Sequence, residues 1–249
     1  MEHEAYIEMH SIEQDHWWYR ARRNLLTKIL DLHCQNPSTI LEVGSGTGGN
    51  VHMLEELGTL TCLEIEPLAI ELSKTRNHNK STQFYSGFLP GGTSSIENKK
   101  FDLICMLDVL EHIEDRIGAL RALHEHMDSS STLFITVPSY QWMWAPHDER
   151  LHHKRRYTRK RLIDDLRRAG FEVIDVGYFN TLLFPVAVIS RFFGKLTKTN
   201  PGEKTPTPWI NALLLRVFSL EVHTVGSSLH MFGLSTWGIF RIEAKENNT

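Results

Sequence analysis

Residues 40–50 read Ile-Leu-Glu-Val-Gly-Ser-Gly-Thr-Gly-Gly-Asn, and this stretch decides the fold. An apolar run containing one acid ends in a turn with glycines at 44, 46 and 48, and a helical pattern begins after the turn. Glycine suits such a turn because a Cβ would block the approach of a ligand to the backbone, and because some of these positions are expected to need a positive φ. The stretch therefore predicts a strand that leads into a loop able to bind a nucleotide-like ligand.

Glu42, two residues before the first glycine, distinguishes between two kinds of nucleotide site. An extra anion gains nothing beside a pyrophosphate, whereas it suits a cationic, zwitterionic ligand. The Glu-x-Gly-x-Gly-x-Gly pattern resembles the first motif of the class I S-adenosylmethionine-dependent methyltransferases. A dinucleotide-dependent oxidoreductase is the less favoured interpretation, because Glu42 would place a further anion beside its pyrophosphate. The resemblance implies that S-adenosyl-L-methionine is the cofactor and that this loop binds it through Glu42, Gly44, Ser45, Gly46 and Gly48.

A second acid is expected to hold the ribose of the cofactor. Residues 60–65 predict a second strand, and Pro67 is well placed to open the helix that follows. A carboxylate at the end of this strand, about 20 residues after the glycine loop, is where a ribose diol is bound in related folds. The resemblance favours Glu64 for this role, with Ile65 beside it in the cofactor site, and leaves Glu66 to charge the first turn of the helix.

The next predicted strand, residues 82–86, leads to the adenine end of the implied cofactor site. The resemblance places Gly87, Phe88 and Leu89 there. Relatives often carry Asp at the position of Phe88, where it hydrogen-bonds the adenine amino group. This chain departs from that pattern, so we expect backbone groups and an apolar face to recognise adenine.

The fourth predicted strand, residues 101–107, runs into Asp108-Val109-Leu110-Glu111-His112 and matches the fourth-strand motif of the family. Ligands of open α/β sheets bind outside the carboxyl ends of the strands. The resemblance therefore implies that Asp108 and Val109 line the methyl-donor site. His112 fits equally well a contact with the cofactor and a packing role beneath it.

Two further motifs extend the resemblance to a bacterial branch of these methyltransferases whose substrates are mostly unassigned. One is His16-Trp17-Trp18-Tyr19 followed by Arg22-Arg23, and the other is His147-Asp148 followed by His152-His153-Lys154-Arg155-Arg156-Tyr157. From the first motif we expect Trp18 to lie over the cofactor and Arg22 to reach its carboxylate. The alternative is a helix that packs its aromatic stripe against the edge of the sheet.

The segment 140–157 is predicted to be a loop that binds the acceptor. This segment contains three aromatic residues and three histidines, which packing alone does not easily explain. Loops positioned by a rigid scaffold often carry functional residues. Methyl transfer is an in-line displacement from a sulfonium, and an oxygen or carbon nucleophile must also lose a proton, for which histidine is suited near neutral pH. The expected acceptor contacts are Tyr140, Trp142 and Trp144, and the catalytic candidates are His147, His152, His153 and Tyr157.

Other roles for the same segment remain open. His147, Asp148 and His152 could together supply metal ligands. Neighbouring His and Asp in a loop are more often hydrogen-bonding structure, so we predict no metal site. Arg155 and Arg156 are candidates for binding a phosphate or carboxylate of the acceptor. The competing interpretation of this basic stretch is the solvated face of the helix that follows.

Composition sets outer limits on the function. The chain has 249 residues and a net charge of −3, which fits one domain with a generous core and argues against nucleic acid as an obligatory partner. Its three cysteines show no metal-like spacing, and its acidic start lacks the apolar segment of a signal peptide. We therefore expect a cytoplasmic protein, either a monomer or a homodimer, that acts on a small-molecule acceptor of apolar or anionic character.

Strand and helix patterns alternate along the middle of the chain, which predicts an α/β fold with a doubly wound, mostly parallel seven-stranded sheet. The expected elements are strands at 39–43, 60–65, 82–86, 101–107 and 132–137 and helices at 48–57, 67–77 and 114–127. A final strand at 234–244, antiparallel to 171–179, would give the reversed last strand of class I methyltransferases. The expected organisation is an N-terminal helical cap (1–36), a cofactor-binding core (37–180), a helical insertion (181–233) and the final strand with a tail (234–249).

The predicted insertion holds two apolar helical stretches, residues 181–193 and 209–220, each too short to span a membrane and each containing an arginine. A cap over the site or a dimer face is the favoured role, and contact with a membrane interface is the minority one. The alternative to an enzyme is a non-catalytic cofactor-binding or adaptor protein whose C-terminal helices bind a partner. The aromatics and histidines of 140–157 speak against that alternative.

Overall fold

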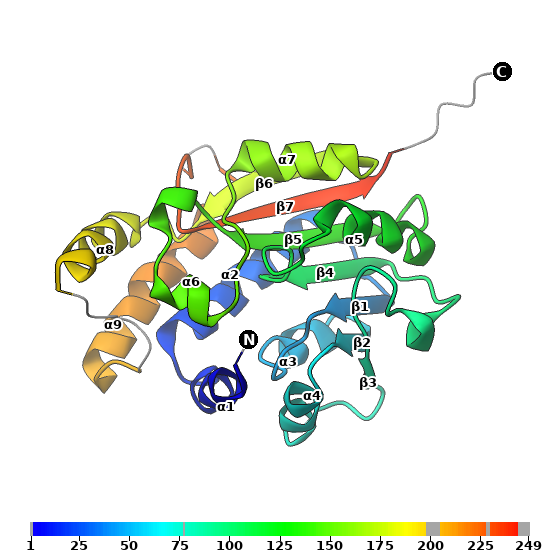
Figure 1. Cartoon of the computed structure of the whole chain (residues 1–249), viewed down its shortest axis with the longest axis horizontal. Helices are drawn as coiled ribbons and strands as arrows, with labels where there is room; N and C mark the ends of the chain where they lie inside the picture. The colour runs from blue at the N-terminus through cyan, green and yellow to red at the C-terminus, as the bar shows by residue number, and fades with distance from the viewer. Residues whose placement is uncertain (1, 77, 198–204, 228–229, 244–249) are drawn as a thin grey trace.

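The computed structural model describes residues 2–76, 78–197, 205–227 and 230–243. Within these residues seven strands form one sheet in the order β3-β2-β1-β4-β5-β7-β6 (Figure 1). The strands are β1 (Thr39–Val43), β2 (Thr59–Glu64), β3 (Gln83–Ser86), β4 (Leu103–Leu107), β5 (Thr132–Pro138), β6 (Phe171–Phe179) and β7 (Ser235–Ile242). Strands β1 to β5 pair in parallel, whereas β7 runs antiparallel to both β5 and β6. The predicted doubly wound sheet with a reversed last strand is confirmed.

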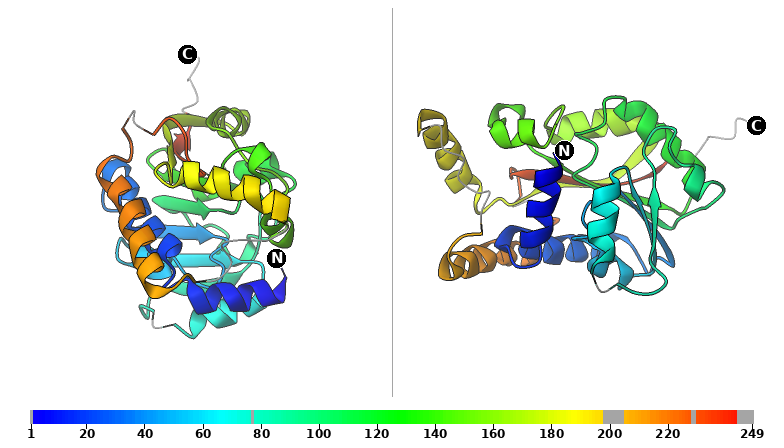
Figure 2. Two further views of the ribbon diagram at one scale, coloured as in Figure 1. Left: turned by 90° about the vertical axis from the view of Figure 1, so that its left-hand side faces the viewer. Right: turned by 60° about the horizontal axis from the view of Figure 1, so that its bottom comes forward.

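Helices cover both faces of the sheet (Figure 2). They are α1 (His3–Ile12), α2 (Trp17–His33), α3 (Val51–Glu55), α4 (Pro67–Lys74), α5 (Arg116–Ala122), α6 (Pro146–Arg150), α7 (Arg159–Arg168), α8 (Phe184–Thr197) and α9 (Pro208–Ser219). Short 3-10 turns add η1 (Ser94–Ile96), η2 (Leu123–His126), η3 (Gln141–Met143) and η4 (Leu220–His223). Among the described residues, no helix combines the length and apolar character that a membrane crossing requires.

Three element predictions need correction. The helix predicted at 48–57 is shortened to α3 (Val51–Glu55), since Gly48 has a positive φ that a helix does not allow. The helix predicted at 114–127 is α5 followed by the 3-10 turn η2, because the last turn tightens before the chain enters β5. The segment 140–157, predicted to be a loop, contains the 3-10 turn η3 and the helix α6. Residue 77 of the predicted helix 67–77, residues 198–204 and 228–229 of the predicted insertion, and residue 244 of the predicted strand 234–244 with the tail after it lie outside the described residues.

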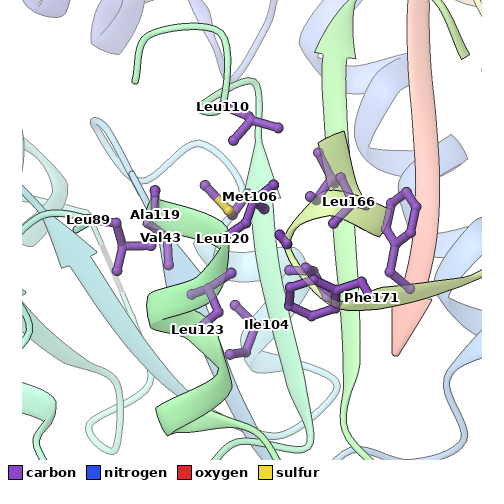
Figure 3. Close-up of a cluster of buried hydrophobic side chains, with 14 of the residues drawn as sticks. Val43, Leu89, Ile104, Met106, Leu110, Ala119, Leu120, Leu123, Leu166 and Phe171 are labelled. Atoms are coloured by element: carbon purple, nitrogen blue, oxygen red, sulfur yellow. The ribbon is translucent and has the colours of Figure 1, made fainter. Parts of the chain in front are cut away.

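The central strands are buried on both faces, and their side chains alternate between two clusters. In β1, Ile40 joins a cluster with Leu25 and Leu26 of α2, whereas Leu41 joins a second cluster with Leu120 of α5 and Leu166 of α7. Figure 3 shows part of the second cluster. Alternation follows from the two-residue period of a strand, and helices on both faces make a continuous apolar run the stable choice for a parallel strand.

The second helix of the predicted insertion belongs to the core. Phe218 of α9 is fully buried, stacks on Phe179 of β6 with ring centroids 6.3 Å apart, and meets Trp17 of α2 edge-on at 6.1 Å. Oδ1 of Asn211 accepts a hydrogen bond from the Trp17 N–H at 2.8 Å. Helix α9 therefore fixes the start of α2, which carries the residues predicted to cover the cofactor.

We expect Phe218→Ala to lower the free energy of unfolding by about 3–5 kcal/mol, because it leaves a cavity between α9, α2 and β6. Urea unfolding followed by circular dichroism measures this change. The control is Leu213→Ala on the exposed side of the same helix, where the change should stay within about 0.5 kcal/mol. Equal effects of the two substitutions would mean that α9 is not part of the cooperative core.

Candidate functional site

The glycine loop closes against the residues that follow β4 and against α4. Gly44, Gly46 and Gly48 have positive φ angles of 70°, 53° and 83°, as the sequence suggested. A Cβ on Gly44 would lie 2.6 Å from Cγ2 of Val109. A Cβ on Gly48 would lie 2.3 Å from Oγ of Ser73. Glycine is therefore needed at positions 44 and 48 for the backbone conformation and for the close approach of their neighbours.

Glu64, at the end of β2, lies against the same loop. Its buried carboxylate accepts hydrogen bonds from the Gly46 N–H at 2.8 Å and from the Glu66 N–H at 2.9 Å. Burial raises the pKa of Glu64, and these two N–H groups oppose the rise. The Glu66 side chain caps α4 by accepting from the Leu68 N–H at 3.3 Å. Of the two acids in this stretch, Glu64 is the one that faces the glycine loop.

Apolar side chains are exposed where the adenine end of the cofactor is predicted. Ile65, directly after β2, is 61% exposed, and Phe88, after β3, is 50% exposed. Gly87 joins the two strand ends, because its N–H donates to the Glu64 carbonyl oxygen at 3.0 Å. The Leu89 side chain is buried in the core (Figure 3), so it offers no surface to a ligand.

Glu42 lies beneath the glycine loop and is fully buried. Its Oε1 accepts a hydrogen bond from Nδ2 of Asn50 at 3.0 Å, while its Oε2 has no hydrogen-bond partner. Burial raises the pKa of Glu42 from 4.5 to about 8. The carboxyl is therefore largely protonated at neutral pH, which differs from the charged group that the motif suggested.

Arg22 connects α2 to the turn after β4, to β5 and to the start of α3. Its Nη2 forms an ion pair with Asp108 Oδ2 at 2.8 Å and donates to Thr136 Oγ1 at 3.1 Å, and its Nη1 donates to Asn50 Oδ1 at 3.2 Å. The Trp18 ring covers the guanidinium at 5.3 Å. Asp108 itself has a φ of 61°, an uncommon conformation for a residue with a side chain. The structure thus engages Arg22 with Asp108, whereas the sequence suggested the carboxylate of the cofactor.

Helix α1 lies beside α4 (Figure 1) and is fastened to the glycine loop by Glu13. The buried Glu13 carboxylate accepts from Thr47 Oγ1 at 2.7 Å and forms an ion pair with Arg76. Arg76 also donates to the His10 carbonyl oxygen at 3.0 Å and to the Thr47 carbonyl oxygen at 3.0 Å. The N-terminal cap therefore closes over the loop through polar contacts that the sequence did not reveal.

A second polar cluster follows β4. His112 meets His153 edge-on, with ring centroids 4.6 Å apart, and burial beside His153 lowers the pKa of His112 to about 3. Asp148 is fully buried and accepts from His153 Nδ1 at 2.9 Å and from Arg156 Nε at 2.7 Å. Burial alone would raise the pKa of Asp148, but the hydrogen bonds from His153 and Arg156 outweigh it and hold that pKa well below its usual range. Glu111 completes the cluster.

The other residues predicted for catalysis and anion binding lie differently. His147 and His152 are exposed, while His153 faces inward. The Tyr157 hydroxyl is buried without a hydrogen-bond partner, and burial raises the pKa of Tyr157 to about 12. Arg155 donates to the carbonyl oxygens of Ile113 and Glu114, and Arg156 pairs with Asp148. Both guanidinium groups are thus bonded within the protein.

The three predicted aromatic acceptor contacts separate into two places. Tyr140 stacks on Trp142 with centroids 5.7 Å apart and on Tyr178 at 5.5 Å, and meets Phe184 of α8 edge-on at 5.6 Å. Trp142 remains 57% exposed. Trp144 lies apart from this stack, and its indole N–H donates to Glu149 at 3.4 Å. The start of the insertion thus adds Phe184, which sequence reasoning did not single out, to the aromatic surface.

Sequence reasoning also missed the buried acids Glu13 and Glu111, and it did not show that Asp148 is buried. Glu13, Glu111 and Asp148 are each 3% exposed or less. The signal that could have pointed to Asp148 is the pattern Ala145-Pro146-His147-Asp148, because Pro at the first position and Asp at the third position favour a helix start. Glu111 sits within the fourth-strand motif, and nothing in its sequence neighbourhood distinguishes a buried acid from an exposed one.

Comparison with known proteins supports the methyltransferase interpretation. A curated relative is the mitochondrial ubiquinone biosynthesis O-methyltransferase of Schizosaccharomyces pombe, which is 26% identical over 130 residues, 50% of this chain and 47% of that protein. The chain thus spans about half the length of this relative. The similarity therefore covers only a part of that enzyme.

Solved structures share the fold at low sequence identity. The protein solved in complex with the Haloferax volcanii Trm112 methyltransferase activator superposes with a TM-score of 0.61 at 13% identity, covering 96% of this chain and 94% of that chain. The S-adenosylmethionine dependent methyltransferase from Mesorhizobium loti gives a TM-score of 0.57 at 14% identity, covering 86% and 95%. The family model described as a methyltransferase domain matches residues 15–176. The chain therefore belongs to the methyltransferase-domain family, as its motifs predicted.

Proposed function

We propose that the protein transfers the methyl group of S-adenosyl-L-methionine to an oxygen atom of a small, largely apolar acceptor. The observation that carries the proposal is the convergence of the glycine loop, Glu64 and Asp108 at the carboxyl ends of β1, β2 and β4, in a chain of this family. In open α/β sheets that edge is where ligands bind. The choice of an oxygen acceptor is supported by the similarity to the ubiquinone biosynthesis O-methyltransferase of Schizosaccharomyces pombe, at 26% identity over half of this chain.

Each part of the cofactor has a candidate partner. The glycine loop, with Ser45, offers backbone to the methionine part of the cofactor. Glu64 is the acid for the ribose diol, and the exposed Ile65 and Phe88 offer apolar faces to adenine, with Gly87 between them. Asp108 and Val109 lie after β4, where the methyl group is expected. Because Arg22 is paired with Asp108, we infer that Arg22 and Trp18 position this turn.

The acceptor is expected on the side of the segment 140–157. The stack of Tyr140, Trp142 and Phe184 is aromatic and partly exposed, which favours an apolar or aromatic acceptor. With Arg155 and Arg156 bonded within the protein, an anionic acceptor loses its predicted partners. An oxygen nucleophile must lose its proton as it attacks the methyl carbon and the carbon–sulfur bond breaks. Of the three predicted catalytic histidines, His153 faces inward, and its ring contacts His112 in the turn after β4.

The first prediction concerns Glu64. Glu64→Ala should weaken binding of S-adenosylhomocysteine by about 1–3 kcal/mol, because the ribose loses a charged hydrogen-bond partner. Isothermal titration calorimetry measures this change, with Glu66→Ala as the matched control two residues away. NAD should not bind to the wild-type protein. Unchanged affinity in Glu64→Ala would refute the ribose assignment, and binding of NAD alone would refute the cofactor.

The second prediction concerns the pH dependence of stability. Because the pKa of Glu42 is raised from 4.5 to about 8, the folded chain keeps a proton that the unfolded chain loses above about pH 4.5. The proton's contribution to stability is complete below pH 4.5 and disappears as the pH rises towards 8. Glu42→Gln has no such proton to lose and keeps an oxygen for the Asn50 side chain.

Between pH 5 and pH 7, the free energy of unfolding of the wild type should therefore fall by on the order of 2 kcal/mol relative to that of Glu42→Gln. Urea unfolding of the cofactor-free proteins at several pH values measures the difference. Glu71→Gln on the exposed side of α4 is the control and should run parallel to the wild type. A parallel course for Glu42→Gln would mean that Glu42 is ionised in the fold.

A further inference from the structure

Three side chains with metal-binding atoms converge just beyond β4. Glu111 and His112 belong to the turn after the strand, next to Leu110, which Figure 3 shows at the end of β4. His153 comes from the segment between α6 and α7. One ligand atom of each of Glu111, His112 and His153 lies within 4.8 Å of the other two. The described residues contain no second group of this kind.

Glu111 is the residue that calls for an explanation. Its side chain is fully buried, and neither carboxylate oxygen has a hydrogen-bond partner. A buried carboxyl group without partners is costly, and native proteins pair such groups or use them to bind a cation. Nε2 of His153 lies 4.0 Å from Glu111 Oε1. That distance is too long for a hydrogen bond and leaves the second oxygen unused.

His153 is held in the orientation that a metal ligand needs. Asp148 Oδ1 lies 2.9 Å from Nδ1 of His153, and the Asp148 carboxylate is fixed in turn by two nitrogen atoms of Arg156 at 2.7 and 3.0 Å. An ionised Asp148 accepts the proton of Nδ1, so the lone pair of His153 is on Nε2, which faces Glu111. A histidine that donates its other nitrogen to a carboxylate is the usual outer arrangement of metal sites.

The backbone also fixes the distance between the two contributing segments. The Lys154 N–H donates to the Glu111 carbonyl oxygen at 2.8 Å, and the Arg155 guanidinium donates to the Ile113 carbonyl oxygen. Together they join the backbone on either side of His112 to the two residues that follow His153. The two segments that carry the ligand atoms are therefore held at a fixed separation, which favours a site with defined geometry.

We propose that Glu111, His112 and His153 bind one divalent transition metal ion, with zinc the best fit to a two-histidine, one-carboxylate set. Zinc bonds of about 2.1 Å place tetrahedral ligands about 3.4 Å apart, so side-chain rotations that close the cluster by about 1 Å complete the shell. Three protein ligands leave a fourth position for water or a substrate atom. The half-buried His112 marks the side from which that position is reached.

The open position gives the ion a role in the reaction, and this step rests on the proposed function. Glu111 follows Asp108 by one turn of chain, and Asp108 marks the predicted place of the methyl donor. A hydroxyl oxygen bound at the fourth position has its pKa lowered by the cation. It therefore gives up its proton to solvent more readily before it attacks the methyl group. The acceptor class implied is a phenol or another hydroxyl compound.

The test is metal binding by the whole, untagged chain after removal of metals with a chelator, without any cofactor. Calorimetric titration with Zn²⁺ should give one ion per chain, and Co²⁺ should give the visible absorption of a four- or five-coordinate ion. Glu111→Gln and His153→Gln should each weaken Zn²⁺ binding at least tenfold, and Asp148→Asn, which acts through His153, should weaken it by about 10–100-fold. Circular dichroism confirms that each variant is folded.

The matched control is His52→Gln. His52 is an exposed histidine beside two acids, Glu55 and Glu56, so this variant tests for nonspecific binding of the metal at the surface. Its replacement should leave the stoichiometry and affinity unchanged. The metal site is refuted if the wild type binds no ion, or if Glu111→Gln and His153→Gln bind Zn²⁺ as the wild type does. Titration of the metal-free wild type with S-adenosylhomocysteine separates this result from a failure of the proposed function.

Discussion

The buried guanidinium of Arg22 is the contact on which the candidate site depends most. A cation withdrawn from water must be paired, and here Asp108 from the turn after β4, Thr136 from β5 and Asn50 at the start of α3 supply its partners. The ion pair holds Asp108 at a φ of 61°, a conformation that costs about 1–3 kcal/mol without support. This ion pair therefore stabilises the conformation of the turn after β4. It also helps to position Glu111 and His112, which follow Asp108 in that turn.

A second buried ion pair, between Asp148 and Arg156, plays the corresponding role on the acceptor side. It fixes His153 against the turn after β4, so the two pairs lie on either side of the same short stretch of chain. Both pairs join residues far apart in sequence or in different elements. Breaking either one leaves an unpaired charge in the interior, which is far more costly than losing a surface ion pair. The site is thus organised by polar contacts, while the sheet is organised by apolar ones.

The fold could be predicted from the sequence because its signals are local. The apolar run before Gly44, the spacing of the glycines and the alternation of strand and helix patterns each constrain nearby residues, and the structure confirms the resulting topology. The site was predicted less completely. The sequence indicated that Glu64 and His153 matter, but it did not show that Glu42 and Glu111 are buried. Burial arises from residues distant in the chain, such as α2 and the 140–157 segment, and no single stretch encodes it.

The order of strands at the edge of the sheet has a consequence for synthesis of the chain. Strand β7 lies between β5 and β6, although it follows both in sequence. In the described residues β6 pairs with β7 alone, so β6 emerges from the ribosome with no neighbour to accept its backbone hydrogen bonds. About a hundred residues separate β5 from β7, and contacts so distant in sequence form slowly. Until β7 is synthesised, the edges of β5 and β6 that it will cover are therefore open to pairing with other chains, which makes aggregation the expected failure during this period.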